Sequence, residues 1–145
     1  MSTMACLVLP RDIVAEIKRV VFRTTNETGV RLVGEFEACR YVVRYIIGPG
    51  GRAIQKPNYY ECDNEYAERQ FAYLLQREPH LRFLGELHVH PQGEAELSWK
   101  DLATVRKVLR SLPFFIAGTI VRRPFAILPV LFSRNTIVSL SCVLR

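Results

Sequence analysis

The chain has 145 residues, enough for one substantial hydrophobic core, and we expect a single domain spanning residues 1–145. Its composition, 49% hydrophobic and 23% charged, is that of an ordinary globular protein. The formal net charge is +6, but the arginines are scattered rather than gathered into a stripe, which argues against nucleic acid as a partner. A solvated basic surface explains the charge most simply, and attraction of an acidic partner is the alternative. No apolar run approaches the roughly 18–20 residues that span a bilayer, so no membrane partner is expected.

In the first half of the chain, strand and helix patterns alternate. Apolar residues recur at helical spacing in two segments, which predicts helices over 11–22 and 64–77. Short runs rich in β-branched and aromatic residues predict strands over 4–9, 29–38 and 39–48. We expect the polar stretch from Pro49 to about Asn64 to be a loop, because it opens with Gly50 and Gly51.

The second half adds one helix and four strands. Strands are predicted over 81–89, 114–122, 124–132 and 136–144. A third helix is predicted over 98–112, with an apolar face made of Leu102, Val105, Leu109 and Leu112. Pro129, inside a predicted strand, suggests an edge position or a bulge. Three helices and a mixed sheet that share one core make an α+β fold.

The cysteines lie far apart and form no C-x-x-C pair: Cys6, Cys39, Cys62 and Cys142. Their spacing supports neither a zinc ribbon nor a thioredoxin-type site, so we interpret them as inert thiols, mostly in apolar strands. Unpaired thiols indicate a reducing, intracellular setting. The N-terminus also lacks the basic segment and long apolar stretch of a secretory signal, and we therefore expect a cytoplasmic protein.

The segment HVHPQGEAELSWKD, residues 88–101, gathers two imidazoles, a hydroxyl and a carboxylate. Residues two apart in a strand point to the same face, so His88 and His90 should project side by side at the strand end that Pro91 closes. Two imidazoles at this spacing suit a metal ion, which binds nitrogen at about 2.0–2.1 Å when it is zinc. Alternating histidines on a strand are more often ordinary surface residues, so the pair alone proves little.

Asp101 strengthens the metal interpretation. Three histidine or carboxylate ligands with one open position make a catalytic zinc site, and an aspartate in the first turn of the next helix can reach back over the strand end. The competing interpretation is a capping box, with Ser98 as the N-cap and Asp101 at position N3. Ser98 could serve both as the cap and as a polar group beside the metal.

A hydrolytic metal site also needs a base. Glu27 lies where the first long strand begins, followed by Gly29 and Gly34, which let backbones approach closely. An ordinary turn carboxylate is the alternative for Glu27, and spacing alone does not decide between the two. Glu86 falls on the same strand face as His88 and is a candidate for a supporting role, against a plain strand-edge carboxylate.

These pieces together resemble the JAMM metalloproteases, also called the Jab or MPN+ domain. The family pattern is H-x-H-P, six residues, then S-x-x-D, with an upstream E-T-G-x-x-L-x-G; it is matched here by 88–91, 98–101 and 27–34. The resemblance covers nearly the whole chain and implies an MPN-type α+β domain, with a curved mixed sheet flanked by about three helices in a cytidine-deaminase-like layering. Two departures, Val89 and the pair Val30-Arg31, fall at positions that carry no chemistry.

The resemblance also implies a role for each site residue. His88, His90 and Asp101 would bind one Zn²⁺, with a water at the fourth position. Glu27 would take the proton of that water and later deliver it to the leaving amine. Ser98 would help to stabilise the tetrahedral oxyanion. No covalent enzyme intermediate is needed, so a cysteine nucleophile is not expected.

Members of this family cleave isopeptide or peptide bonds after the C-terminal Gly-Gly of ubiquitin or a ubiquitin-like protein. The expected partner is therefore a ubiquitin-like protein or its conjugate, together with the enzymes that activate or conjugate it. The short 49–63 loop resembles compact bacterial members, and Tyr59 and Tyr60 within it are candidates for guiding the substrate tail, against an ordinary solvated loop. Trp99 is interpreted as a rim or packing residue, with a substrate wall as the alternative. The alternative function is a non-catalytic MPN-type scaffold.

Overall fold

The computed structural model describes residues 5–90 and 96–145. Within these ranges the helices are α1 (Arg11–Val21), α2 (Asn64–Arg77) and α3 (Trp99–Val108). The strands are β1 (Cys6–Leu9), β2 (Thr28–Glu37), β3 (Arg40–Ile47), β4 (Ile54–Lys56), β5 (Tyr59–Glu61), β6 (Arg82–Val89), β7 (Phe114–Val121), β8 (Ala126–Ser133), β9 (Ile137–Ser139) and β10 (Ser141–Leu144). Most of these elements follow the predicted segments closely.

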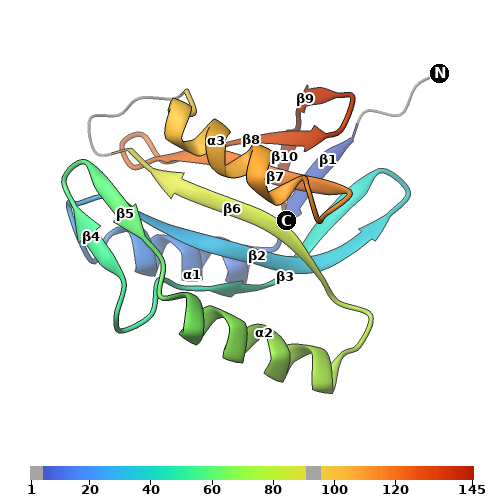
Figure 1. Ribbon diagram of the computed structural model, residues 1–145, viewed down its shortest axis with the longest axis horizontal. Helices are drawn as coiled ribbons and strands as arrows, with labels where there is room; N and C mark the ends of the chain where they lie inside the picture. The colour runs from blue at the N-terminus through green and yellow to red at the C-terminus, as the bar shows by residue number, and fades with distance from the viewer. Residues whose placement is uncertain (1–4, 91–95) are drawn as a thin grey trace.

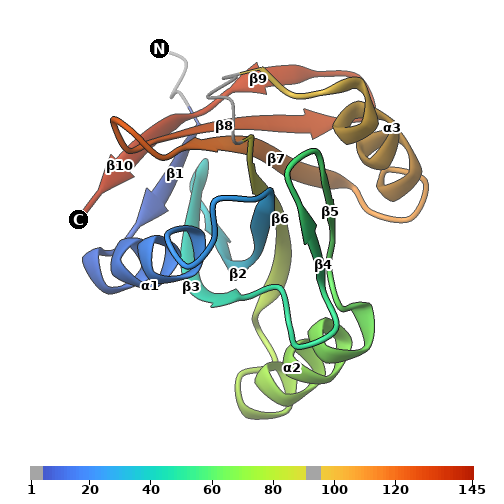
Figure 2. The same cartoon turned by 90° about the vertical axis from the view of Figure 1, so that its left-hand side faces the viewer.

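Eight of the strands form one mixed sheet in the order β10-β1-β3-β2-β6-β7-β8-β9. β1 runs parallel to β3 and β10, and β6 runs parallel to β7, while the remaining neighbours are antiparallel. The sheet curls until β10 contacts β8, so that it is nearly closed (Figures 1 and 2). A large mixed sheet with three helices in the described part of the chain confirms the predicted α+β class.

Helix α1 covers one face of the sheet, while α2 and α3 lie on the other (Figure 2). α1 buries Ile13, Ile17 and Val21, which recur at helical spacing and form one apolar stripe. This stripe packs into the main hydrophobic core, whose strand residues include Leu7, Leu9, Val30, Leu32, Val43, Leu84, Leu87 and Ile116. Leu87 and Val89, near the end of β6, are therefore held by packing in this hydrophobic core.

The helices of the other face sit on smaller apolar clusters. α2 begins at Asp63, whose carboxylate accepts a first-turn backbone N–H at 3.1 Å, and packs through Ala67 against Val33. α3 packs through Val105 against Phe115 of β7. Because β6 and β7 are parallel neighbours, α3 is the crossover between them, and its start lies near the end of β6.

The stretch expected to be a loop contains a hairpin. β4 and β5 pair antiparallel as a separate two-stranded sheet, which lies between α2 and α3 in Figure 2. The hairpin is tied to the start of β2, since the backbone N–H of Glu27 donates to the carbonyl of Lys56 at 2.9 Å. Three-residue strands carry too few apolar positions for any periodicity to predict them.

Three further expectations were wrong, and one was confirmed. The last predicted strand is two strands, β9 and β10, which separate at Leu140 and pair at opposite ends of the sheet. Leu102, expected in the core, is 37% exposed on the outer face of α3, and that helix ends at Val108. Cys39, expected in a strand, is exposed in the β2–β3 turn with a φ of 65°. Pro129 lies just beyond the last β8–β9 pair, which is the edge-like position predicted for it.

None of the helices within residues 5–90 and 96–145 is long and apolar enough to cross a membrane.

The tight approach of β6 and β7 generates a testable prediction at Gly85. A Cβ at this position would lie 1.8 Å from the Ile116 carbonyl oxygen, so Gly85→Ala forces two neighbouring backbones apart. We expect a loss on the order of 3 kcal/mol or more in the free energy of unfolding, measured by urea denaturation. Gly51→Ala is the matched control, because a Cβ there has no described atom within 4 Å. Equal losses in the two variants would contradict this account of the sheet.

Candidate active site

The end of β6 carries both predicted histidine ligands. His88 pairs with Gly29 on β2 and with Thr119 on β7, and His90 directly follows the strand. The side chain of His90 is 5% exposed and that of His88 is 23% exposed. Both rings face the N-terminal turn of α3, as the two-residue period of a strand predicted.

Asp101 joins the two histidines. Its Oδ1 lies 3.1 Å from His88 Nδ1, and its Oδ2 lies 3.1 Å from His90 Nε2. Oδ2 also accepts the backbone N–H of Ser98 at 2.9 Å, while Ser98 Oγ accepts the N–H of Asp101 at 3.1 Å. The predicted capping box is therefore confirmed, and the same carboxylate both completes the box and contacts the histidines. The two interpretations of this segment are compatible.

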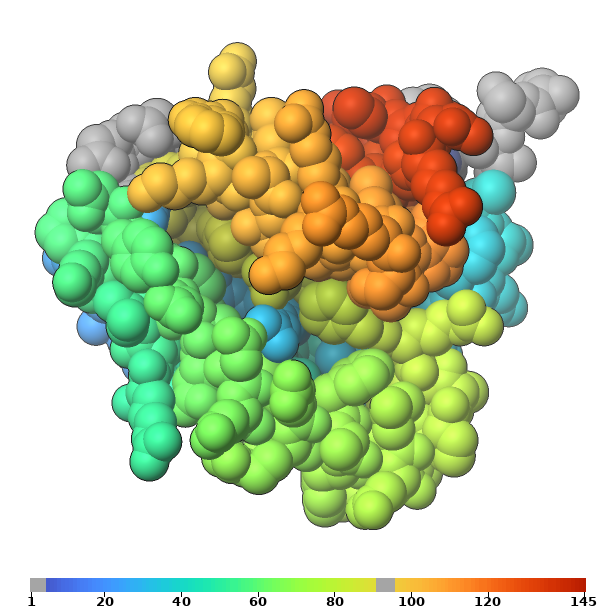
Figure 3. All heavy atoms as spheres, viewed as in Figure 1, coloured from blue at the N-terminus to red at the C-terminus, as the bar shows by residue number. Residues whose placement is uncertain are grey.

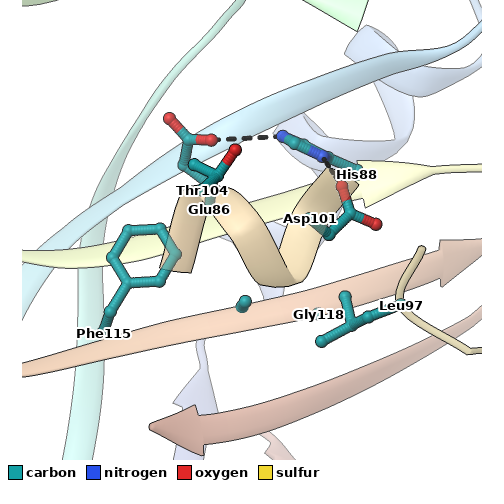
Figure 4. A pocket seen from close by; sticks show the side chains of 8 residues that line it. Glu86, His88, Leu97, Asp101, Thr104, Phe115 and Gly118 are labelled. Carbon is teal, nitrogen blue, oxygen red and sulfur yellow. Dashed lines mark hydrogen bonds and ion pairs between the residues drawn. The ribbon is translucent and has the colours of Figure 1, made fainter. Parts of the chain in front are cut away.

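A second carboxylate holds His88 from the other side. Glu86 Oε2 lies 3.1 Å from His88 Nε2, and Arg31 Nε donates to Glu86 Oε1 at 2.7 Å. Arg31 Nη2 also donates to Asn64 Oδ1 at 2.6 Å, which links the network to the start of α2. Dashed lines in Figure 4 mark the contacts of His88 with both carboxylates. A carboxylate on the second ring nitrogen is the usual means of orienting a metal-binding histidine.

The space for the His88 ring depends on Gly29 of β2. A Cβ at Gly29 would lie 2.7 Å from His88 Cδ2 and 2.9 Å from Tyr60 Cε2. Tyr60 belongs to β5 and meets the His88 ring edge-on, with 5.2 Å between ring centres. Burial raises the pKa of the Tyr60 phenol, so it stays neutral at physiological pH. The β4–β5 hairpin thereby shields one side of His88.

Glu27 lies directly before β2, whose first residue, Thr28, pairs with Val89 of β6. Its half-buried position raises the pKa of its carboxyl; His90 opposes this shift and Asp101 adds to it. Because Thr28 pairs with Val89, their neighbours Glu27 and His90 lie at the same end of the β2–β6 pair.

The segment that carries Glu27 is held from two sides. On one side is the hairpin, whose Lys56 carbonyl accepts the Glu27 N–H. On the other is Arg122, which follows β7 and donates through Nε to the Val21 carbonyl at 2.9 Å and through Nη2 to the Asn26 carbonyl at 2.6 Å. The end of β7 thus fixes the chain just before Glu27.

Charge holds together the cluster of His88, Asp101 and Glu86. Burial disfavours a charged His88, but hydrogen bonds with Asp101 and Glu86 outweigh it and raise the pKa of His88 to about 9. Burial would raise the pKa of Asp101, yet its contacts with the histidines hold that pKa well below the usual range. The pKa of Glu86 is lowered in the same way, against the effect of burial.

The donor set fits a zinc ion chemically, because two imidazoles and one carboxylate are typical ligands of catalytic zinc sites. The two imidazoles contact different oxygens of Asp101: His88 Nδ1 lies 3.1 Å from Oδ1, and His90 Nε2 lies 3.1 Å from Oδ2. Within residues 5–90 and 96–145, however, no three histidine, cysteine or carboxylate side chains already form a metal cage. Asp101 bonds directly to the imidazole nitrogens, so the donor set fits zinc by its chemistry and not as a preformed cage.

A small hollow adjoins the cluster between β6, β7 and α3. It is lined by Glu86, His88, Leu97, Asp101, Thr104, Phe115, Ala117 and Gly118 (Figure 4). Its volume is about 10 Å³, roughly the space of one water molecule. The hollow therefore admits a water or a very small group beside His88 and Asp101, and no larger side chain.

Some contributors to the site escaped prediction from the sequence. No local pattern reveals Arg122, because its acceptors lie about a hundred residues earlier in the chain. Arg31 was noted only as a departure from the family pattern, yet it is the ion-pair partner of Glu86. His80, the remaining histidine of the chain, pairs with Glu35 at 2.6 Å near the opposite end of β6.

Comparison with known proteins identifies a shared fold and no family. No protein-family model matches the sequence, and no curated protein matches it either. Among solved structures, the chain is similar to protein DSY2949 from Desulfitobacterium hafniense, a solution structure, with a TM-score of 0.71. The alignment covers 96% of this chain and 92% of that one at 19% identity. At this identity the likeness concerns the fold alone.

The Arg31–Glu86 pair provides a test of the network behind His88. Arg31→Met keeps the aliphatic stem but leaves the largely buried Glu86 carboxylate without its guanidinium. We expect a loss of about 1–3 kcal/mol in the free energy of unfolding, measured by urea denaturation at neutral pH. Arg44→Met is the control, because the Arg44–Glu35 pair is more exposed and should contribute less than about 1 kcal/mol. Equal losses in the free energy of unfolding would mean that the Arg31–Glu86 pair stabilises the fold no more than an exposed ion pair does.

Proposed function

We propose that this protein is a zinc-dependent metalloprotease or isopeptidase of the JAMM (MPN+) type. It hydrolyses the bond that follows the C-terminus of a ubiquitin-like protein, in deconjugation or in precursor processing. The observation that carries the proposal is the mutual contact of His88, His90 and Asp101, with Glu27 at the adjoining strand end. The curved mixed sheet and the order of its helices also suit an MPN-type domain.

Glu27 is suited to act as the general base. It is half-buried, and a raised pKa makes its carboxylate a stronger proton acceptor. It takes a proton from the attacking water and returns it to the nitrogen of the leaving amine. Glu86 is a further carboxylate beside His88, but Arg31 and His88 already engage both of its oxygens, so it orients rather than transfers protons.

His88, His90 and Asp101 would hold the zinc ion, which supplies a positive charge for the scissile carbonyl and lowers the pKa of a bound water towards about 7. Ser98 contributes from the N-cap of α3. Its Oγ accepts the Asp101 N–H, which leaves the hydroxyl hydrogen to donate to the developing oxyanion. The capping bond also fixes the position of that hydroxyl relative to the carboxylate of Asp101.

The surroundings of the cluster suit an extended, glycine-rich tail. The β4–β5 hairpin covers one side of His88, and Lys100 Nζ at the start of α3 lies 5.6 Å from the centre of the Tyr59 ring on β5. A backbone that approaches between these elements has little room for side chains next to the scissile bond. We infer that the tail adds alongside β5 in extended form, a common mode of peptide recognition.

The proposal predicts one Zn²⁺ per chain. His88→Ala and His90→Ala should each remove most of the zinc, because each deletes one of three protein ligands. Metal content is measured by elemental analysis of purified protein after dialysis against limiting zinc. His80→Ala is the matched control and should keep its zinc, since His80 pairs with Glu35 at the other end of β6. Full zinc in a variant lacking both His88 and His90 would rule out this site.

The proposal also predicts that Glu27→Gln separates chemistry from metal binding. Turnover should fall by about 10²–10⁴-fold, because only the base is lost, while zinc content and the unfolding midpoint stay unchanged. The assay uses fusions of ubiquitin or a ubiquitin-like protein to a cargo, with the junction either Gly-Gly or two bulky residues.

Cleavage should occur only at the Gly-Gly junction and should stop when a zinc chelator is added. Equal cleavage of both junctions, or cleavage that survives the chelator, would defeat the proposed activity. Zinc binding without any cleavage across the panel would instead favour the non-catalytic scaffold.

A further inference from the structure

Helix α3 presents a second, outward stripe of side chains that has no role in the cluster around Asp101. These side chains recur at spacings of three and four residues along α3 and into the turn that follows it, and all are exposed: Trp99, Leu102, Ala103, Arg106 and Lys107 on the helix and Arg110 in the turn. We call them the α3 outer surface. Figure 3 shows the atoms of α3, in orange, on the outside of the molecule. The inward side of the same helix is held by Val105, so the outward stripe contributes nothing to the core.

The apolar end of the α3 outer surface is unusual for a solvated helix. Trp99 is 81% exposed and Leu102 is 37% exposed, one helical turn apart. Trp99 is the one tryptophan of the chain, and neither residue is required by the capping box that starts the helix. Tryptophan and arginine are the residues most enriched at the energetic centres of protein interfaces.

The other end of this surface is uniformly basic. Arg106, Lys107 and Arg110 line a hollow of about 360 Å³ on α3, and Arg110 also lines an adjoining hollow of about 540 Å³ with Arg134. Among the described residues that line the two hollows, none is acidic. Basic residues in the last turn of a helix complement its dipole, which explains Arg106 and Lys107 locally but not the cation at Arg134.

We propose that the α3 outer surface is a docking site for an acidic segment of a partner protein. Carboxylates pair with the three cations of this surface and with Arg134 beside it. They pair preferentially with the arginines, whose guanidinium groups bind carboxylates through two parallel hydrogen bonds. Apolar side chains of the same segment cover Trp99 and Leu102. Nucleic acid fits less well, because single strands bind on several stacking aromatics and this surface carries one. The inference goes beyond the proposed hydrolysis and does not depend on it.

The test uses Trp99 as its own reporter. A short peptide of repeating Glu-Glu-Leu units is titrated into the full-length protein while tryptophan emission is followed. A saturable shift of the emission to shorter wavelengths is expected, because the peptide removes the indole from water. Added salt should weaken binding, because exposed charges are screened. The same peptide with glutamine for glutamate should bind at least about tenfold more weakly, since the charge-assisted pairs are lost.

Matched variants locate the site. The triple variant Arg106→Glu, Lys107→Glu, Arg110→Glu should lose about tenfold or more in affinity, measured with a fluorescently labelled copy of the peptide. The control reverses three exposed arginines on α2 and the start of β6, Arg69, Arg77 and Arg82, which changes the net charge equally, from +6 to 0. The control should bind as the parent does. Leu102→Gln, a single exposed change that leaves the fold intact, should also weaken binding.

Four outcomes would overturn the inference. The first is no saturable change of Trp99 emission with the acidic peptide, and the second is equal binding of the glutamine peptide. The third is an equal loss of affinity in the control variant, which would indicate a general charge effect. The fourth is tighter binding of single-stranded oligothymidine or of anionic lipid vesicles than of the acidic peptide, which would assign the surface to another class of partner. Each is read by the same titration, whether or not the protein cleaves any fusion.

Discussion

The carboxylate of Asp101 is the interaction on which the candidate site depends. Its two oxygens contact His88 and His90 and also complete the capping box with Ser98. The positive end of the α3 dipole also favours a negative charge at this N3 position. The start of the helix is therefore tied to the end of β6 by charge as well as by packing. That carboxylate is the contact that both imidazoles share with α3.

Around this contact, the charges alternate along a continuous chain. Arg31 pairs with Glu86, Glu86 with His88, and His88 with Asp101. Each buried charge is thereby compensated by its neighbour, which is the condition for keeping such groups away from water. The neighbouring strands β2 and β6 supply the first three members, so the orientation of His88 is set by side chains from the middle of the sheet.

The inner and outer sides of α3 face different parts of the molecule's surroundings: one side faces the cluster around Asp101 and the other faces solvent. Its first turn and inner side complete the cluster and the small hollow beside it, while its outer surface carries exposed Trp99 and a row of cations. In our proposal, the acidic partner considered as one explanation of the +6 net charge would bind this outer surface. A partner held there would lie one helical turn from Asp101.

The sequence by itself determined the elements whose patterns are local. Helices α1 and α2, strand β6 and the Ser98–Asp101 capping box follow from periodicity and from residues three apart. The motif spacing likewise named Glu27 and the three residues that meet at the end of β6. What only the tertiary structure decided depends on contacts between distant segments. Periodicity in the sequence does not predict three of these features. They are the pairing of β4 with β5, the exposure of Leu102, and the hydrogen bonds of Arg122 to the segment before Glu27. Their positions follow from strand pairing and from carbonyls far away in the chain, which local propensity does not encode.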